Sequence, residues 1–193
     1  MTPGFLGGSF DPPHLGHLVL AQEAMEAFRL DRVYFIPARH PPHKDISRVT
    51  PFACRLRMLE TSIEGDDRFS VLDIEPPEGP SYTVEMIERL SRRFPGGRPC
   101  LILGMDSLAE LHLWREPDRI LREADVVVGT RPGFSPEGVS VERLAKVRLF
   151  GFPGVCISST QIREKVSRGR SVKYLVTEEV RSYIRGKGLY GSG

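Results

Sequence analysis

Short runs of apolar, often β-branched residues recur along the chain and alternate with longer stretches in which apolar residues repeat every three or four positions. The short runs predict buried strands, and the longer stretches predict amphipathic helices. Regular alternation of the two is typical of an α/β domain whose strands form a parallel sheet. The predicted strands are Gly4–Gly7, Arg32–Ile36, Phe69–Ile74, Cys100–Leu103, Asp125–Gly129 and Val147–Phe150.

Helical periodicity predicts three helices between these strands, each burying one apolar stripe. After residue 157 the strand signals end, and two further helices are predicted over Ser159–Ser167 and Thr177–Gly186. Gly186 is placed to end the second of them. The three apolar stripes are Leu18, Ala21, Met25 and Phe28; Ala53, Leu56, Leu59 and Ile63; and Val84, Ile87, Leu90 and Phe94.

The composition supports one domain with a proper core. The chain has 193 residues, of which 40% are hydrophobic, so it needs no disulfides to hold it together. We expect a single domain over 1–193, with a sheet core over about 1–150 and a helical C-terminal part over about 151–193. Cys54, Cys100 and Cys156 are odd in number, widely spaced and set among apolar neighbours, which predicts buried thiols.

The charge balance and the apolar runs exclude several classes of protein. The chain carries 27 Lys and Arg against 25 Asp and Glu, so nothing favours a broad nucleic-acid or membrane surface. The longest apolar runs are strand-length, far short of the roughly 18 residues that a membrane span needs. The first residues lack the basic and apolar regions of a secretory signal. We therefore expect a cytoplasmic protein with no nucleic-acid or membrane partner.

The most informative segment follows the first predicted strand and reads Gly-Gly-Ser-Phe-Asp-Pro-Pro-His-Leu-Gly-His-Leu over residues 7–18. Its paired glycines let backbone N–H groups approach a ligand. His14 and His17 lie three positions apart in the first turn of the next helix, so both rings share one face at the positive helix end. A phosphate group suits such a loop, and a plain turn is the alternative. The chain has neither the G-x-G-x-x-G fingerprint nor a P-loop, which argues against a dehydrogenase and against a kinase.

A second candidate anion site precedes the first C-terminal helix. Ser158 and Gln161 have the spacing of a capping box, which explains helix initiation by itself. Ser159 and Thr160 would still offer amides and hydroxyls at the positive helix end, and Arg163 lies one turn further on. Two such helix starts at the carboxyl edge of one sheet predict a polyphosphate between them, such as a nucleoside triphosphate.

Three weaker signals surround these sites. Asp106 follows a predicted strand and is suited to accept hydrogen bonds from ribose hydroxyls, or to cap the helix that begins near Ser107. Residues 41–44, Pro-Pro-His-Lys, form a stiff loop with two donor groups that are otherwise solvated. Trp114 precedes Arg115, and its indole either packs in the core or stacks on an aromatic ligand.

A zinc site is a further alternative. His40 and His43 repeat the spacing of His14 and His17, so four histidines are available as ligands. No cysteine or carboxylate stands beside them in a known ligand spacing, which argues against a zinc-binding structural protein.

Taken together, the motifs resemble a known family. Residues 7–18 resemble the Gly-Gly-Thr/Ser-Phe-Asp-Pro-x-His-x-Gly-His-Leu signature of the nucleotidyltransferase superfamily, and residues 157–163 resemble its Ile-Ser-Ser/Ala-Thr-x-Ile-Arg signature. Five further segments resemble the bacterial nicotinate-mononucleotide adenylyltransferases within that superfamily, namely 36–44, 80–83, 104–107, 114–115 and 131–133. The resemblance implies a Rossmann-like α/β fold, with helices on both faces of a parallel sheet and a small helical C-terminal subdomain.

The same resemblance implies transfer of the adenylyl group of ATP to nicotinate mononucleotide, which yields deamido-NAD and pyrophosphate in NAD biosynthesis. Mg²⁺ would be carried mainly by the ATP phosphates, without a protein metal site. The implied ATP-binding residues are Gly8, Ser9, His14, His17, Gly104, Asp106, Ser159, Thr160 and Arg163. The implied mononucleotide-binding residues are His43, Lys44, Tyr82, Thr83, Trp114, Arg115 and Arg131. The implied catalytic residues are His14, His17, Lys44 and Arg163.

Two alternatives to this function stay open at the level of sequence. One keeps the chemistry and changes the acceptor to phosphopantetheine, an alcohol phosphate with CTP, or the amide mononucleotide. The other is a sensor that binds ATP without turnover. The sequence determines neither the preference for acid over amide nor the oligomeric state, for which a homodimer is one possibility.

Overall fold

The computed structural model describes residues 2–42, 44–130, 139–154 and 156–191. Its centre is a six-stranded sheet with the order β3-β2-β1-β4-β5-β6, and every neighbouring pair is parallel. This is the Rossmann-like order that the resemblance implies, and all six predicted strands are confirmed. The strands are β1 (Pro3–Gly8), β2 (Arg32–Pro37), β3 (Phe69–Val71), β4 (Cys100–Gly104), β5 (Asp125–Thr130) and β6 (Arg148–Gly151).

The third strand is shorter than predicted. Leu72 still donates its backbone N–H to the carbonyl of Phe35, at 2.9 Å, but the ladder with β2 ends there. Residues 72–74, Leu-Asp-Ile, which the prediction places in the strand, lie beyond the end of this ladder. β3 lies at the edge of the sheet, where only one neighbour is available to extend the pairing.

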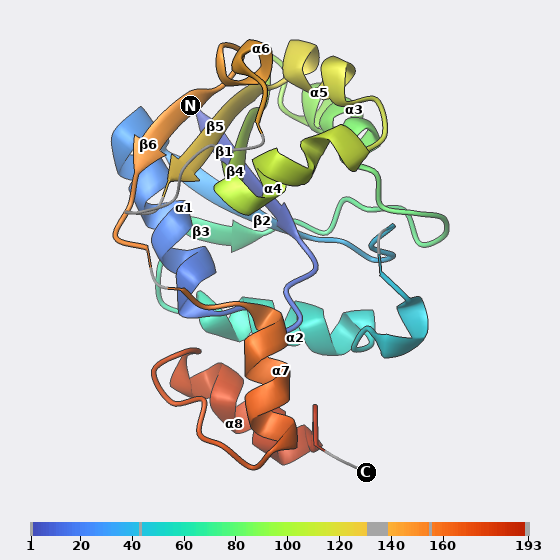
Figure 1. The fold of residues 1–193 in the computed structure, drawn as a ribbon, viewed down its shortest axis with the longest axis vertical. Coiled ribbons are helices and arrows are strands. Elements are labelled where there is room, and N and C mark those ends of the chain that lie inside the picture. The colour runs from blue at the N-terminus through green and yellow to red at the C-terminus, as the bar shows by residue number, and fades with distance from the viewer. Residues whose placement is uncertain (1, 43, 131–138, 155, 192–193) are drawn as a thin grey trace.

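Helices cover both faces of the sheet, as expected. Alternate residues of β1 point to opposite faces: Phe5 packs in one core cluster with α3, α4 and α5, while Leu6 packs in another with α1. Figure 1 shows α1 on one side of the strands and the group around α3 to α5 on the other. The helices are α1 (Leu15–Phe28), α2 (Phe52–Ser62), α3 (Thr83–Arg93), α4 (Met105–Glu110), α5 (Pro117–Glu123), α6 (Val141–Leu144), α7 (Ser159–Ser167) and α8 (Glu178–Lys187), with short 3-10 turns η1 (Ile46–Arg48) and η2 (Leu111–Leu113).

A third core cluster joins the C-terminal helices to α2. Leu59 of α2 packs in the cluster beneath the sheet, whereas Met58 packs with Ile162 of α7 and Val180 of α8. The predicted single stripe on this helix is therefore wrong in part, since Ala53 is exposed. A helix that lies between two layers buries two faces, and one apolar stripe does not describe it. Figure 1 shows α2 between the sheet and the α7–α8 pair.

Helix α7 has the predicted bounds, but the predicted end of α8 is wrong. The helix runs through Gly186 and ends at Gly188, which has φ of 60°. Glycine tolerates this left-handed conformation at a helix end, so the second glycine of the pair is the terminator.

The cysteines differ from one another in burial. Cys100 is buried as predicted, and burial raises the pKa of its thiol to about 11. Cys54 is half-buried, and the prediction is wrong for Cys156, which is exposed. In that connecting segment the neighbouring Ile157 is buried instead. An apolar neighbour in the sequence therefore did not mean that the cysteine itself lies in the core.

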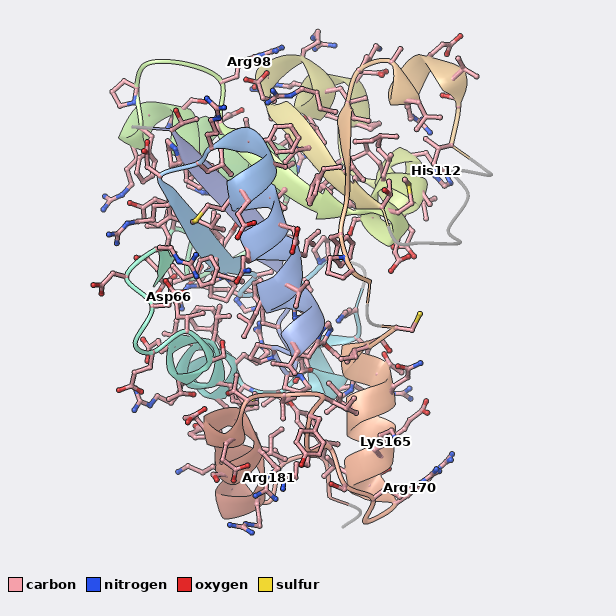
Figure 2. All side chains as sticks on the ribbon, turned by 90° about the vertical axis from the view of Figure 1, so that its left-hand side faces the viewer. Asp66, Arg98, His112, Lys165, Arg170 and Arg181 are labelled. Carbon is pink, nitrogen blue, oxygen red and sulfur yellow. The ribbon has the colours of Figure 1, made fainter. Side chains whose placement is uncertain are left out.

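The outer surface is charged. Figure 2 shows Arg98 and Arg170 at the outside of the molecule, and both are exposed. No helix in the described part of the chain is long and apolar enough to cross a membrane.

Candidate active site

A cavity of about 550 Å³ opens at the carboxyl ends of the central strands. Gly8 at the end of β1 and Gly104 at the end of β4 both line it. These two strands are neighbours, and the chain crosses from β1 to β2 on one side and from β4 to β5 on the other. The cavity thus lies at the point where the strand order reverses, which is where open α/β sheets bind nucleotides.

The loop after β1 orients two histidines toward this cavity. His14 is the N-cap of α1 and His17 is its third residue, and both line the cavity. Their rings stack with centroids 3.6 Å apart, so the predicted shared face is confirmed. The backbone N–H of His14 donates to Nδ1 of His17 at 3.2 Å. In the neutral ring this acceptor role puts the proton on Nε2, which makes that atom a donor.

Lys44 adds a cation to the same loop. Its Nζ donates a hydrogen bond to the hydroxyl of Ser9 at 2.7 Å, and both residues line the cavity. The residue as a whole is exposed, but its ammonium is partly enclosed. That burial and the positive charge of Arg163 lower the pKa of Lys44, while Asp11 opposes the shift.

The start of α7 meets the same loop. The predicted capping box is confirmed, because the Ser158 hydroxyl accepts the Gln161 N–H and the Gln161 side chain accepts the Ser158 N–H, both at 3.2 Å. The Ser159 hydroxyl donates to the carbonyl of Pro12 at 2.9 Å. Two positive helix ends, those of α1 and α7, are therefore held side by side at one cavity.

Arg163 behaves differently from the other predicted phosphate-binding residues. Its Nη1 donates to the carbonyl of Asp11 at 2.8 Å, and its Nη2 donates to the Thr160 hydroxyl at 3.2 Å. Thr160 lines the cavity, whereas Arg163 is not among the lining residues. In this structure the guanidinium ties α7 to the loop instead of facing the cavity directly.

The rest of the cavity is built by the starts of α3 and α4. Asp106 lies in the first turn of α4, whose N-cap is Gly104, so the alternative reading of Asp106 as a helix cap is wrong. Tyr82 is the N-cap of α3, and the Arg115 guanidinium lies 4.7 Å above its ring and 3.3 Å from Glu85. Trp114 is half-buried: it packs against the first core cluster and also lines the cavity.

The structure brings most of the predicted site residues to one place. His43 and Arg131 lie outside the described residues. Within the described chain, no three His, Cys, Asp or Glu side chains gather as a metal site, and the His40 ring lies 3.0 Å from the carbonyl of Pro77. The predicted residues that line the cavity are Gly8, Ser9, His14, His17, Lys44, Tyr82, Thr83, Gly104, Asp106, Trp114, Arg115, Ser159 and Thr160.

Sequence reasoning missed two buried charged residues, one that lines the cavity and one that lies beneath it. Glu75 is buried, lines the cavity and accepts a hydrogen bond from Nη2 of Arg89 at 2.9 Å; burial raises the pKa of its carboxyl, and Arg89 opposes this. Arg55 is fully buried in α2. Burial lowers the pKa of its guanidinium, and Asp11 opposes that shift. Neither lies in a motif: a Glu among prolines suggests a solvated loop, and an Arg in a helix suggests an exposed face.

Fold and cavity together define a Rossmann-like nucleotide-binding protein. The cytidylyltransferase-like family matches residues 5–165, and the chain belongs to this family.

Relatives with similarity over almost the whole chain carry one name. A protein of Geobacillus thermodenitrificans named "Probable nicotinate-nucleotide adenylyltransferase" is 42% identical, with 98% of this chain and 86% of that protein covered. A Thermus thermophilus protein of the same name is also 42% identical, over 98% of this chain and 100% of its own length. The chain is also similar to a solved structure, "Plasmodium falciparum nicotinic acid mononucleotide adenylyltransferase complexed with NaAD", with TM-score 0.84, 19% identity and coverage of 98% and 97%. That structural likeness confirms the fold.

Proposed function

We propose that this protein transfers the adenylyl group of ATP to nicotinate mononucleotide, which yields deamido-NAD and pyrophosphate in NAD biosynthesis. The observation that carries the proposal is the meeting of two helix starts, those of α1 and α7, at one cavity together with His14, His17 and Lys44. This arrangement suits the phosphates of a nucleoside triphosphate. The names of the relatives support nicotinate mononucleotide as the acceptor.

The reaction needs no protein base. A phosphate oxygen of the mononucleotide attacks the α-phosphorus of ATP, a new P–O bond forms, and the bond to the β-phosphate oxygen breaks. A phosphate monoester has a second pKa near 6, so the nucleophile is already largely dianionic at neutral pH. Catalysis then consists of alignment and of stabilising charge on the α-phosphate and the leaving pyrophosphate.

The positions of the hydrogen-bond donors indicate which part of the cavity binds ATP. The backbone around Gly8 and Ser9 and the first turns of α1 and α7 present N–H groups to the phosphates. His17, as a donor at Nε2, and Lys44 stabilise the transition state, and His14 supports the His17 ring by stacking. The remaining proposed contacts to ATP are made by Gly104, Asp106, Ser159, Thr160 and, from beside the cavity, Arg163.

The acceptor half is proposed at the aromatic end of the cavity. Trp114 offers an indole face for the pyridine ring, and Tyr82 and Thr83 lie at the N-terminal end of α3, where an anionic carboxylate is favoured. Arg115 is proposed to support the site by holding Tyr82. His43 and Arg131 are proposed as phosphate contacts on sequence grounds alone.

Mg²⁺ is proposed to enter with ATP. Near the starts of α1 and α7 the cavity wall carries cationic side chains and N–H donors, which suit phosphates that bring their own ion rather than a protein cage of carboxylates. When bound, Mg²⁺ neutralises charge on the phosphate oxygens. A cytoplasmic location, and the treatment of 1–193 as one catalytic unit, are part of the same proposal and rest on the sequence.

A panel of acceptors tests this function. Purified protein is incubated with Mg-ATP and either nicotinate mononucleotide or phosphopantetheine. A third reaction contains phosphocholine, with CTP in place of ATP. The products of each reaction are identified by mass. We expect a product with the mass of deamido-NAD and none of the other condensation products. Condensation with another acceptor instead would reassign the substrate, and ATP binding without any product would identify a sensor.

A further inference from the structure

A residue near the C-terminal end of the described chain reaches back to the loop after β1. The Tyr190 hydroxyl donates a hydrogen bond to Oδ1 of Asp11 at 2.7 Å, although the two residues are 179 positions apart. Tyr190 has φ of 61°, a region that residues other than glycine rarely adopt. Such a conformation persists where surrounding contacts impose it. The contacts of the surrounding fold, the hydrogen bond to Asp11 among them, therefore hold Tyr190 in this conformation.

Asp11 is the acceptor of this bond and is itself buried, with 2% of its surface exposed. Its second oxygen accepts the backbone N–H of Thr50 at 3.3 Å. Its backbone carbonyl accepts Nη1 of Arg163 at 2.8 Å. Asp11 is three residues before His14, the N-cap of α1, so its position helps to set the direction in which that helix and its histidines begin.

Asp11 is also the carboxylate that faces the cations of the site. It acts electrostatically on both Lys44 and Arg55, and it raises the pKa of each against the effect of burial. Burial, together with the Asp11 charge, keeps the Tyr190 phenol protonated by raising its pKa, so the phenol is a permanent neutral donor. A neutral donor satisfies a buried carboxylate without adding a charge that would compete with these cations.

We propose that Tyr190 is a positioning residue for adenylyl transfer, which acts through Asp11 to hold the phosphate loop and to leave Lys44 available to the phosphates. Without the hydroxyl, the Asp11 carboxylate lacks one of its donors. Its charge then attracts the Lys44 ammonium more strongly, away from the phosphates whose charge Lys44 stabilises in the transition state. The inference rests on the proposed function.

The test compares Tyr190→Phe, which removes only the hydroxyl, with Tyr183→Phe as a matched control. Tyr183 lies in α8 and packs in the third core cluster. Steady-state kinetics with Mg-ATP and nicotinate mononucleotide are measured for both, together with the midpoint of thermal unfolding. We expect kcat of Tyr190→Phe to fall about tenfold, the effect of losing one hydrogen bond to a charged group. The KM values are expected to change little, and Tyr183→Phe is expected to keep the wild-type kcat. The unfolding midpoint of Tyr190→Phe is expected to fall by a few degrees, because a buried carboxylate loses one donor.

A double-mutant cycle tests whether Tyr190 acts through Asp11. We expect Asp11→Asn to lower kcat as well, and Tyr190→Phe to lower it little further in that background. Additive effects in the double variant, an unchanged kcat in Tyr190→Phe, or equal losses in Tyr190→Phe and Tyr183→Phe would each overturn the inference. Wild-type protein that forms no dinucleotide in the same assay would instead overturn the proposed function, and this inference with it.

Discussion

Arg55 donates a hydrogen bond to the backbone carbonyl of Ser9 at 2.7 Å, across 46 positions of sequence. The same Nη1 donates to the carbonyl of Ala38, also at 2.7 Å. One buried guanidinium in α2 thereby joins the loop after β1 to the loop after β2, and both loops line the cavity. The shape of the site depends on a side chain that lies beneath it.

Replacing Arg55 should therefore destabilise the whole fold. Arg55→Leu removes the guanidinium donor from several half-buried carbonyl oxygens, among them those of Ser9, Ala38 and Thr50. We expect the free energy of unfolding to fall by roughly 2–4 kcal/mol, since each unsatisfied group carries a desolvation cost. Urea denaturation measures this, with Arg57→Leu as the control because Arg57 is exposed on the same helix. Equal stability of the two variants would contradict the bridging role.

His17 is expected to matter more for turnover than for ATP binding. Its Nε2 donor is aimed by the bond that Nδ1 accepts from the His14 N–H. Loss of one preorganised donor to a charged transition state typically costs a factor of about 100 in kcat. We predict that His17→Ala lowers kcat by roughly that factor and changes the KM for ATP much less. His112→Ala, an exposed histidine, is the control. An unchanged kcat in folded His17→Ala would remove His17 from the mechanism.

The lowered pKa of Lys44 predicts how activity depends on pH. Lys44 acts while its ammonium is charged, and that charge is lost as the pH rises through a pKa below the ordinary value for lysine. The alkaline limb of kcat/KM should therefore begin earlier than for a solvated lysine. In Lys44→Arg the limb should move to higher pH, because a guanidinium stays charged. Lys146→Arg, at an exposed position, should leave the limb in place. The same limb in wild type and Lys44→Arg would exclude Lys44 as its source.

Trp114 is expected to contribute to the binding of nicotinate mononucleotide and not to the binding of ATP. Base–aromatic stacking is worth about 1–3 kcal/mol, so Trp114→Ala is expected to raise the KM for nicotinate mononucleotide by tenfold or more. The KM for ATP should change by less than about twofold if the two halves of the cavity are independent. Leu113→Ala, the exposed neighbour, provides the matched control for changes in backbone and fold. A rise in the KM for ATP of similar size would place Trp114 elsewhere in the site.

The parts of this protein that follow from sequence are those with local causes. Short apolar runs, often β-branched, predicted every strand. The spacing of His14 and His17 predicted their common face because three positions make nearly one helical turn. The capping box of Ser158 is equally local.

What sequence did not reveal depends on distant partners. Arg55, Glu75 and Tyr190 owe their positions to groups in other segments, and nothing beside them in sequence distinguishes them from solvated residues. The end of α8 was missed for a different reason: Gly186 and Gly188 both suit a helix end, and the left-handed conformation that ends the helix falls at Gly188.

The most direct test of the whole account is the rate of pyrophosphate release from Mg-ATP, measured in parallel with nicotinate mononucleotide and with its amide. The account predicts rapid release with the acid, a clear preference for it over the amide, and one dinucleotide formed for each pyrophosphate. No release with either mononucleotide would contradict the assignment of the acceptor.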